Sequence, residues 1–199
     1  ELLKNAAGLA AVTEAAITLS KASREDLESS ALSLTSVMNQ FSLSHDQAAR
    51  TMNVLAAGAT AGAATIADTS ESMKNFGSVA AGANVSLEES VALVQVLSKF
   101  ALKGAEAGTK LRGSLIRLQE SGMGYASGQF QINDALVEAR SKLDKLSTAK
   151  EKDAFITKMF GLENVTTGRI LLNNVDLFNQ YTGQVTGTTE AIKQAEINS

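Results

Sequence analysis

Apolar residues recur at helical spacing through the first half of the chain, and hydroxyl residues placed three positions before an acid or amide divide them into segments. Such a pair is a capping box or a near variant of one, and it marks the N-terminus of a helix. Four of these pairs follow one another at intervals of 21 residues, with caps at Ser23, Ser44, Thr65 and Ser86. This spacing predicts antiparallel helices of about 17 residues, each roughly 25 Å long, joined by short connections.

The apolar positions keep one register relative to these caps. They lie 8, 11 and 15 residues after each cap, which places them on a single helical face. The stripe consists of Ala31, Leu34, Met38, Met52, Leu55, Ala59, Met73, Phe76, Ala80, Val94, Leu97 and Ala101. Duplication of a helical unit and a convenient helix-plus-turn length both explain the period, and both predict an all-α bundle or stack of helical hairpins.

The segment that follows Ser86 is apolar on more than one side. Leu87 and Val91 continue the stripe, while Leu93, Val96 and Phe100 extend the apolar surface around the helix. A helix of this kind is buried between layers, so we expect it to be the central helix.

The repeat ends after this segment, and the chain divides into three predicted regions. Residues 1–121 form the helical core, residues 122–133 a glycine-rich linker or short hairpin, and residues 134–199 a smaller C-terminal helical part. Glycines such as Gly122 and Gly128 favour a loop because they adopt positive φ without strain.

Within the C-terminal part, Asp134 is expected to cap one helix and Thr148 to cap the next through a capping box with Glu151. Gly161 is expected to end that second helix. From Val165 onward the helical pattern weakens, which predicts a frayed or partner-dependent end.

Composition narrows the possible functions. The chain has no cysteine and no proline, only 5% aromatic residues and a net charge of −3. Disulfides and thiolate metal sites are excluded, and a dedicated nucleic-acid surface is not expected. The longest uncharged stretch, residues 51–67, is too short and too weakly apolar to predict a membrane span, and its Gly58 and Gly62 favour a close helix crossing instead.

Three candidate chemical sites are weaker than their structural alternatives. His45 stands between a serine and an aspartate in a first helical turn, where contiguous residues cannot form a triad. The stretch Gly104–Lys110 resembles a phosphate-binding loop but is one residue short and lacks a preceding strand. Glu120-Ser121 faintly resembles the catalytic dipeptide of lytic transglycosylases, without the spacing of that family. We therefore expect no catalytic residue, no cofactor and no metal site.

An ordered series of short motifs resembles the N-terminal core region of phage tail tape-measure proteins. The motifs are Met38-Asn-Gln-Phe-Ser-Leu-Ser44, Val54-Leu-Ala-Ala-Gly-Ala59, Met73-Lys-Asn-Phe-Gly-Ser-Val-Ala80, Asn84-Val-Ser-Leu-Glu-Glu-Ser90, Lys103-Gly-Ala-Glu-Ala-Gly-Thr-Lys-Leu-Arg112 and Phe160-Gly161. The fifth motif is the most specific and is interpreted as a signature turn, with Lys103, Gly104, Gly108, Thr109 and Arg112 as its residues. Arg112 is placed to bind exposed carbonyls of the preceding helix end.

The resemblance implies a structural role in a phage or prophage tail. Such proteins set tail length, and their implied partners are other copies of the chain, the tail tube, the baseplate and tail-assembly chaperones. The implied location is the virion tail, and the host cytoplasm during assembly. The capping boxes predict a compact module rather than a part of the extended rod. The alternatives are an α-solenoid that binds partner proteins and, more remotely, a lytic transglycosylase.

Overall fold

The computed structural model describes residues 2–187, and every regular element in that range is helical, which confirms the predicted all-α fold. The α-helices are α1 (Leu2–Ser23), α2 (Leu27–Gln40), α3 (Ala48–Ala61), α4 (Ile66–Gly82), α5 (Leu87–Ser98), α6 (Gly104–Glu120), α7 (Ile132–Asp144), α8 (Ala149–Phe160), α9 (Val165–Asn173) and α10 (Val175–Val185). Two 3₁₀ turns, η1 (His45–Gln47) and η2 (Leu162–Asn164), precede α3 and α9. No helix of the described residues is long and apolar enough to cross a membrane.

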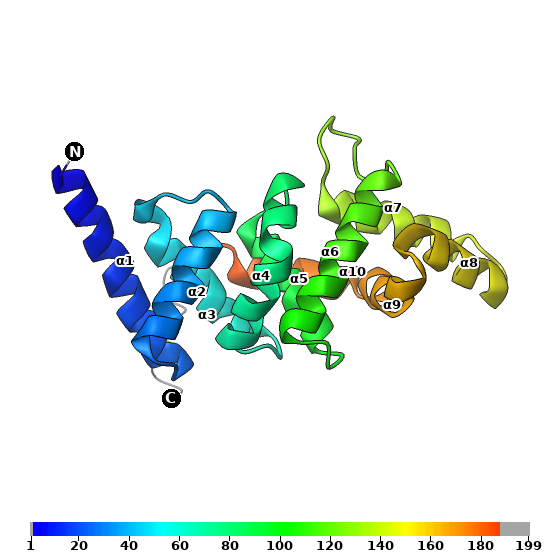
Figure 1. Ribbon diagram of the computed structural model, residues 1–199. Coiled ribbons are helices and arrows are strands. Elements are labelled where there is room, and N and C mark those ends of the chain that lie inside the picture. The colour runs from blue at the N-terminus through cyan, green and yellow to red at the C-terminus, as the bar shows by residue number, and fades with distance from the viewer. Residues whose placement is uncertain (1, 188–199) are drawn as a thin grey trace.

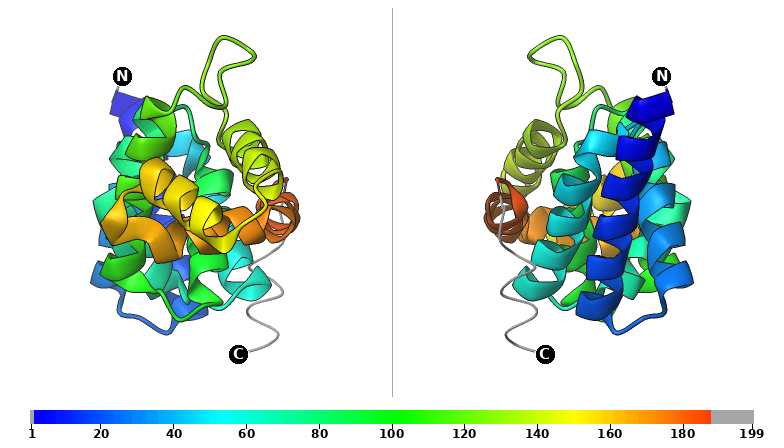
Figure 2. Two further views of the ribbon diagram at one scale, coloured as in Figure 1. Left: turned by 90° about the vertical axis from the view of Figure 1, so that its right-hand side faces the viewer. Right: turned by 90° about the vertical axis from the view of Figure 1, so that its left-hand side faces the viewer.

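The helices from α1 to α6 run alternately up and down and form a stack (Figure 1). Helices α2, α4 and α6 lie side by side in one layer, with α3 and α5 behind them, and α1 closes one end by packing on both α2 and α3. Helix α10 packs along α5 and α3 on the side away from α4 (Figure 2). Helices α7, α8 and α9 complete the opposite end.

The core stripe predicted from the 21-residue period is buried almost throughout. The side chains at the middle position of each repeat, Leu34, Leu55, Phe76 and Leu97, are all 0% exposed. Because these four residues come from α2, α3, α4 and α5, one sequence register supplies the centre of both layers. The helices that follow the caps are mostly shorter than predicted, with 14, 14, 17 and 12 residues.

Helix α5 is the central helix, since all its residues except Glu89 are buried. The stripe ends earlier than predicted, however. The helix stops at Ser98, and Ala101 lies exposed in the connection with φ of 65°, while Phe100 is 44% exposed. The amide of Leu102 donates to the carbonyl of Leu97, which closes the helix end as in a Schellman motif.

Two of the four caps that define the period hold their helices as capping boxes. The hydroxyls of Thr65 and Ser86 accept from the amides of Asp68 and Glu89, whose carboxylates accept from the cap amides in return. Thr148 forms the same arrangement at α8.

The other two caps need correction. Ser23 is the last residue of α1, and α2 is capped by Asp26, whose carboxylate accepts from the amide of Ser29. Ser44 precedes the turn η1, and its hydroxyl donates to Asp46 but accepts no cap hydrogen bond. Ser23 and Asp26 are only three residues apart, so the sequence offered two suitable caps for α2.

The C-terminal half departs further from the prediction. The chain from Ser121 to Gln131 forms turns without a strand, and α7 begins at Ile132 with Gln131 as its cap, so Asp134 lies in the first turn. The expectation of a frayed end after Val165 is wrong for the residues described, because α9 and α10 are packed helices. Thr188 and Thr189, also part of that expectation, lie outside the described residues.

Candidate functional site

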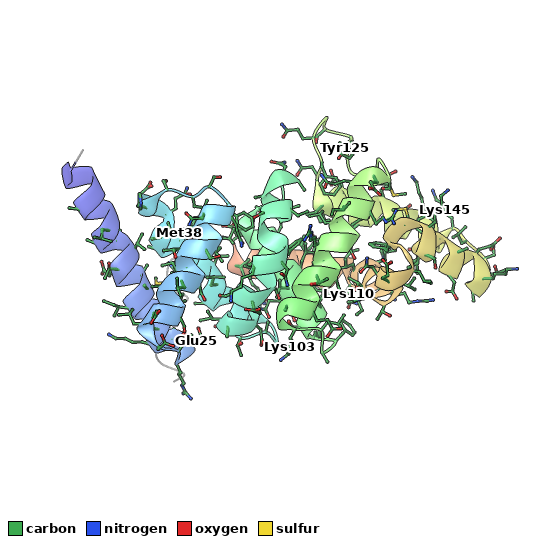
Figure 3. All side chains as sticks on the ribbon, viewed as in Figure 1. Glu25, Met38, Lys103, Lys110, Tyr125 and Lys145 are labelled. Atoms are coloured by element: carbon green, nitrogen blue, oxygen red, sulfur yellow. The ribbon has the colours of Figure 1, made fainter. Side chains whose placement is uncertain are left out.

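The most specific motif of the sequence, Lys103–Arg112, is not a turn. The connection occupies residues 99–102, and Lys103 is the N-cap of α6, so the rest of the motif forms the first two and a half turns of that helix. Lys103 lies at one end of α6 and Lys110 farther along it (Figure 3). Gly104 begins the helix with φ of 55°, a conformation that favours glycine, whereas Gly108 lies inside the helix and has another purpose.

That purpose is a close crossing of α6 with α4. A Cβ atom added to Gly108 would lie 2.2 Å from the carbonyl oxygen of Ser72, which is closer than any real contact. The Ser72 hydroxyl donates to the carbonyl of Gly104 at 2.7 Å, and the Asn75 amide donates to the carbonyl of Ala105 at 3.2 Å. Polar side chains of α4 thus bind backbone carbonyls in the first turn of α6.

This crossing joins two motifs that lie about thirty residues apart in the sequence. Ser72 directly precedes the stretch Met73–Ala80 and Asn75 lies within it, and both bind residues of Lys103–Arg112. The first-turn carbonyls of a helix already accept from amides one turn later. The donors from α4 therefore bind the second lone pairs of these carbonyl oxygens. The two motifs form one helix–helix contact.

The polar residues Thr109, Lys110 and Arg112 of the motif are partly or fully exposed, whereas Ala107 and Leu111 are buried. The Thr109 hydroxyl donates to the carbonyl of Ala105 within α6, at 2.9 Å. The Lys110 ammonium donates to the carbonyl of Glu163 at 2.7 Å and so ties α6 to η2. Arg112 is exposed and, in the part of the chain that the structure describes, makes no hydrogen bond to the preceding helix end, contrary to the prediction.

A second close crossing joins α3 to α5. A Cβ atom on Gly58 would lie 2.3 Å from Cγ1 of Val91, and one on Gly62 would lie 2.2 Å from Oε1 of Gln95. The predicted role of these two glycines in close helix packing is therefore what the geometry shows.

Gln95 itself is fully buried and holds the connection between α3 and α4. Its side-chain oxygen accepts from the amide of Ala64 at 2.9 Å, and its side-chain nitrogen donates to the Ala64 carbonyl and to the Thr69 hydroxyl, both at 3.3 Å. Sequence reasoning did not single out Gln95. The available signal was a lone amide within the run Val91–Leu97, where a buried polar group requires partners.

His45 and Glu120, the two side chains considered as candidates for catalysis, are exposed on different helical elements. His45 is exposed and lies beside α1 near Gly8. Glu120 is exposed and pairs with Arg117 one turn earlier, at 3.4 Å. Within residues 2–187 there is no group of three or more histidine, aspartate or glutamate residues that could hold a metal ion.

Buried polar side chains such as Ser72, Glu88 and Gln95 thus hold helices to one another, which is the pattern of an all-helical structural module. The model of a family described as phage-related minor tail protein matches residues 3–161, and this chain belongs to that family. The match ends at Gly161, where α8 ends, and it includes both close crossings.

Two relatives carry names that agree with this family. The chain is 28% identical over 171 residues to the tape measure protein of Pneumococcus phage Dp-1, an alignment that covers 77% of this chain and 14% of the relative. It is 27% identical over 202 residues to the probable tape measure protein of Escherichia phage P2, covering 94% of this chain and 24% of the relative. The chain is thus similar to a small section of each. No solved structure matches it.

The resemblance to tape-measure proteins that the sequence motifs indicated is therefore confirmed. The chain is similar to a section of these tape-measure proteins, and it folds as a stack of helices.

Proposed function

We propose that this chain is a folded module of the tape-measure polypeptide, and that it acts in tail assembly while other parts of the polypeptide set tail length. The observation that carries the proposal is the stacked helical fold over the matched residues. A tape works by converting residues into distance at 1.5 Å per residue of helix, and a chain that folds back after every helix does not do so.

The partners we propose are other copies of the polypeptide, the tail tube, the baseplate and tail-assembly chaperones. The proposed location is the virion tail, reached from the host cytoplasm during assembly. We further propose that the module acts without catalysis. The exposure of Glu120 and its pairing with Arg117 support this, because a general acid acts within a cleft that holds the substrate.

Tail length measured by electron microscopy tests the division of roles. A phage whose tape-measure gene carries residues 1–199 in tandem duplicate should build tails of unchanged length. If the module were part of an extended rod, the same duplication would lengthen the tail by about 300 Å. Duplication of a matched length of uninterrupted helix elsewhere in the gene is the positive control.

Small-angle X-ray scattering of the isolated chain gives a second test. A stack of helices of this length has a radius of gyration of about 16–20 Å. A continuous helix of the same length would give a value on the order of 85 Å, since it would be about 300 Å long. A rod-like profile would exclude the folded-module proposal.

A further inference from the structure

The connection between α6 and α7 is a loop that projects from the stack of helices (Figures 1 and 2). It runs from residue 121 to residue 131 and is the longest connection between the described helices. Its tip, residues 125–129, has the sequence Tyr-Ala-Ser-Gly-Gln, and all five residues are exposed. Exposed loop tips with small and polar residues are the preferred sites at which proteases cut folded proteins.

The two ends of this loop are fixed to the fold. The amide of Gln131 donates to the carbonyl of Gly124 at 2.9 Å, and the amide of Gly124 donates to the carboxylate of Glu138 on α7 at 3.3 Å. Met123 is 6% exposed and Phe130 is 4% exposed, so a buried side chain anchors the chain on each side of the tip. The tip is therefore held away from the helices by its own base.

The hydrogen bonds of the tip itself are local. The amide of Gly128 donates to the carbonyl of Tyr125 at 2.9 Å, and the hydroxyl of Ser127 donates to the carbonyl of Gln129 at 3.2 Å. An enzyme that binds a peptide in extended form must first break such turns. Because both bonds lie within the tip, it can extend into a protease cleft without unfolding a helix.

We propose that this tip is a site at which a protease of small-residue specificity cuts the folded chain, and that the cut chain stays assembled. Ala126 fits such a protease because its side chain is small and exposed. Hydrolysis breaks the C–N bond between Ala126 and Ser127. The oxygen of the water completes a carboxylate on Ala126, and its two protons pass to the nitrogen of Ser127, which becomes an ammonium group. The proposal does not rest on the tail role.

The cut chain stays assembled because contacts on both sides of the cut join its two pieces. Helix α10, from the second piece, packs along α5 and α3 of the first. The side chains of α10 that are at most 7% exposed are Val175, Phe178, Tyr181 and Val185. The Lys110 ammonium on α6 also donates to the carbonyl of Glu163 at 2.7 Å. Cleavage removes the covalent connection and leaves this packing unchanged.

Limited digestion of the 199-residue chain with elastase, followed by mass spectrometry of the fragments, locates the first cut. The expected fragments are residues 1–126 and 127–199. Ala63 is the internal control, because it is also exposed and also lies in a connection, but the Gln95 side chain binds the backbone of its neighbour Ala64. Cleavage after Ala126 should be at least about tenfold faster than cleavage after Ala63. The Ala126→Glu variant should slow the first cut, and Ala63→Glu should not. A first cut outside residues 125–129 would overturn the proposed site.

Gel filtration of the cut chain at about 10 µM shows whether the two fragments stay together. They should elute at the volume of the uncut chain and separate only in denaturant. Phe178→Ala, which removes a side chain that is 1% exposed, should weaken the association of the fragments by at least about a hundredfold. Leu162→Ala is the matched control, since Leu162 belongs to the same fragment and is 80% exposed.

Circular dichroism of the uncut variants shows whether each one folds. If uncut Phe178→Ala does not fold, Val175→Ala takes its place, with an expected loss of association of at least about tenfold. Fragments of the unsubstituted chain that separate at this concentration would overturn the proposed assembly. Equal association of the α10 variant and Leu162→Ala would overturn the assignment of that assembly to α10.

Discussion

The guanidinium group of Arg50 on α3 donates three hydrogen bonds to the carboxylate of Glu88 on α5, at 3.0, 2.7 and 2.9 Å. The Glu88 side chain is 10% exposed and that of Arg50 is 46% exposed, so the pair lies at the edge of the core. It fixes the first turn of α3 against the first turn of the central helix. A bidentate arginine–carboxylate pair of this kind fixes the relative orientation of the two helices and also adds binding energy.

Replacing Arg50 with Ala should destabilise the fold by about 1–3 kcal/mol, because it leaves a nearly buried carboxylate without a partner. Chemical denaturation measures the loss. The control is Arg140→Ala, whose partners Asp144 and Asp176 are 68% and 87% exposed and whose removal should change stability by less than about 1 kcal/mol. Equal losses in the two variants would mean that the Arg50–Glu88 pair has no special role.

Replacing Gly108 with Ala should destabilise the fold by about 3 kcal/mol, because the added carbon meets the backbone of Ser72 and the two helices must move apart. Gly82, the last residue of α4, has nothing within 4 Å of an added Cβ. Gly82→Ala should therefore be neutral or stabilise by up to about 1 kcal/mol. Thermal unfolding of the two variants side by side gives the comparison, and a tolerated Gly108→Ala would contradict the close crossing.

Replacing Ala101 with Gly should stabilise the fold by about 0.5–1 kcal/mol. Ala101 has φ of 65°, a left-handed conformation that costs an alanine more than a glycine. The same substitution at Ala154, an exposed residue inside α8, should destabilise the fold by about 1 kcal/mol, because glycine gives the unfolded chain more backbone freedom, which is lost when the helix forms. Opposite signs in denaturant midpoints are the expected result, and a shared sign would argue against the strained connection.

The capping box at α8 should affect acid stability. The backbone amide of Thr148 and then its hydroxyl donate to the Glu151 carboxylate and hold its pKa below the ordinary value of 4.5. A lowered pKa in the folded state adds stability above about pH 4.5, and that stability is lost as the pH falls further.

Thr148→Ala should cost about 1 kcal/mol near neutral pH through loss of the cap. Carboxyl NMR should show the Glu151 pKa moving up toward 4.5, and the stability difference from the natural chain should shrink in acid. An unchanged Glu151 pKa in the variant would assign the shift to another cause.

Local signals in the sequence predicted the elements they control directly. The boxes at Thr65, Ser86 and Thr148 are complete within four residues, so no tertiary contact is needed to recognise them. At α2 the period favours Ser23 as the cap, whereas Asp26, three residues later, is the cap that the helix uses. Val175, Phe178 and Val185 stand at helical spacing and pack as α10, although the glycines and threonines around them weaken the helical pattern of this segment.

The crossing of α4 and α6 could not be derived from sequence in the same way. A run with two glycines fits a turn as well as a helix that touches another backbone, and only the position of Ser72 decides between them. The division of the chain at residues 122–133 stays a prediction. The contacts of α10 with α3 and α5 show that the C-terminal part packs on the first part.

The glycines at the two close crossings have a consequence for how this family evolves. Gly108 admits no side chain because it meets backbone, whereas Gly58 and Gly62 meet side chains that can change together with them. Across distant phages, position 108 should therefore remain glycine after most of the surrounding sequence has diverged, while positions 58 and 62 should covary with 91 and 95. Sequence divergence in this module is therefore limited most strictly where two helix backbones are too close to leave room for a side chain.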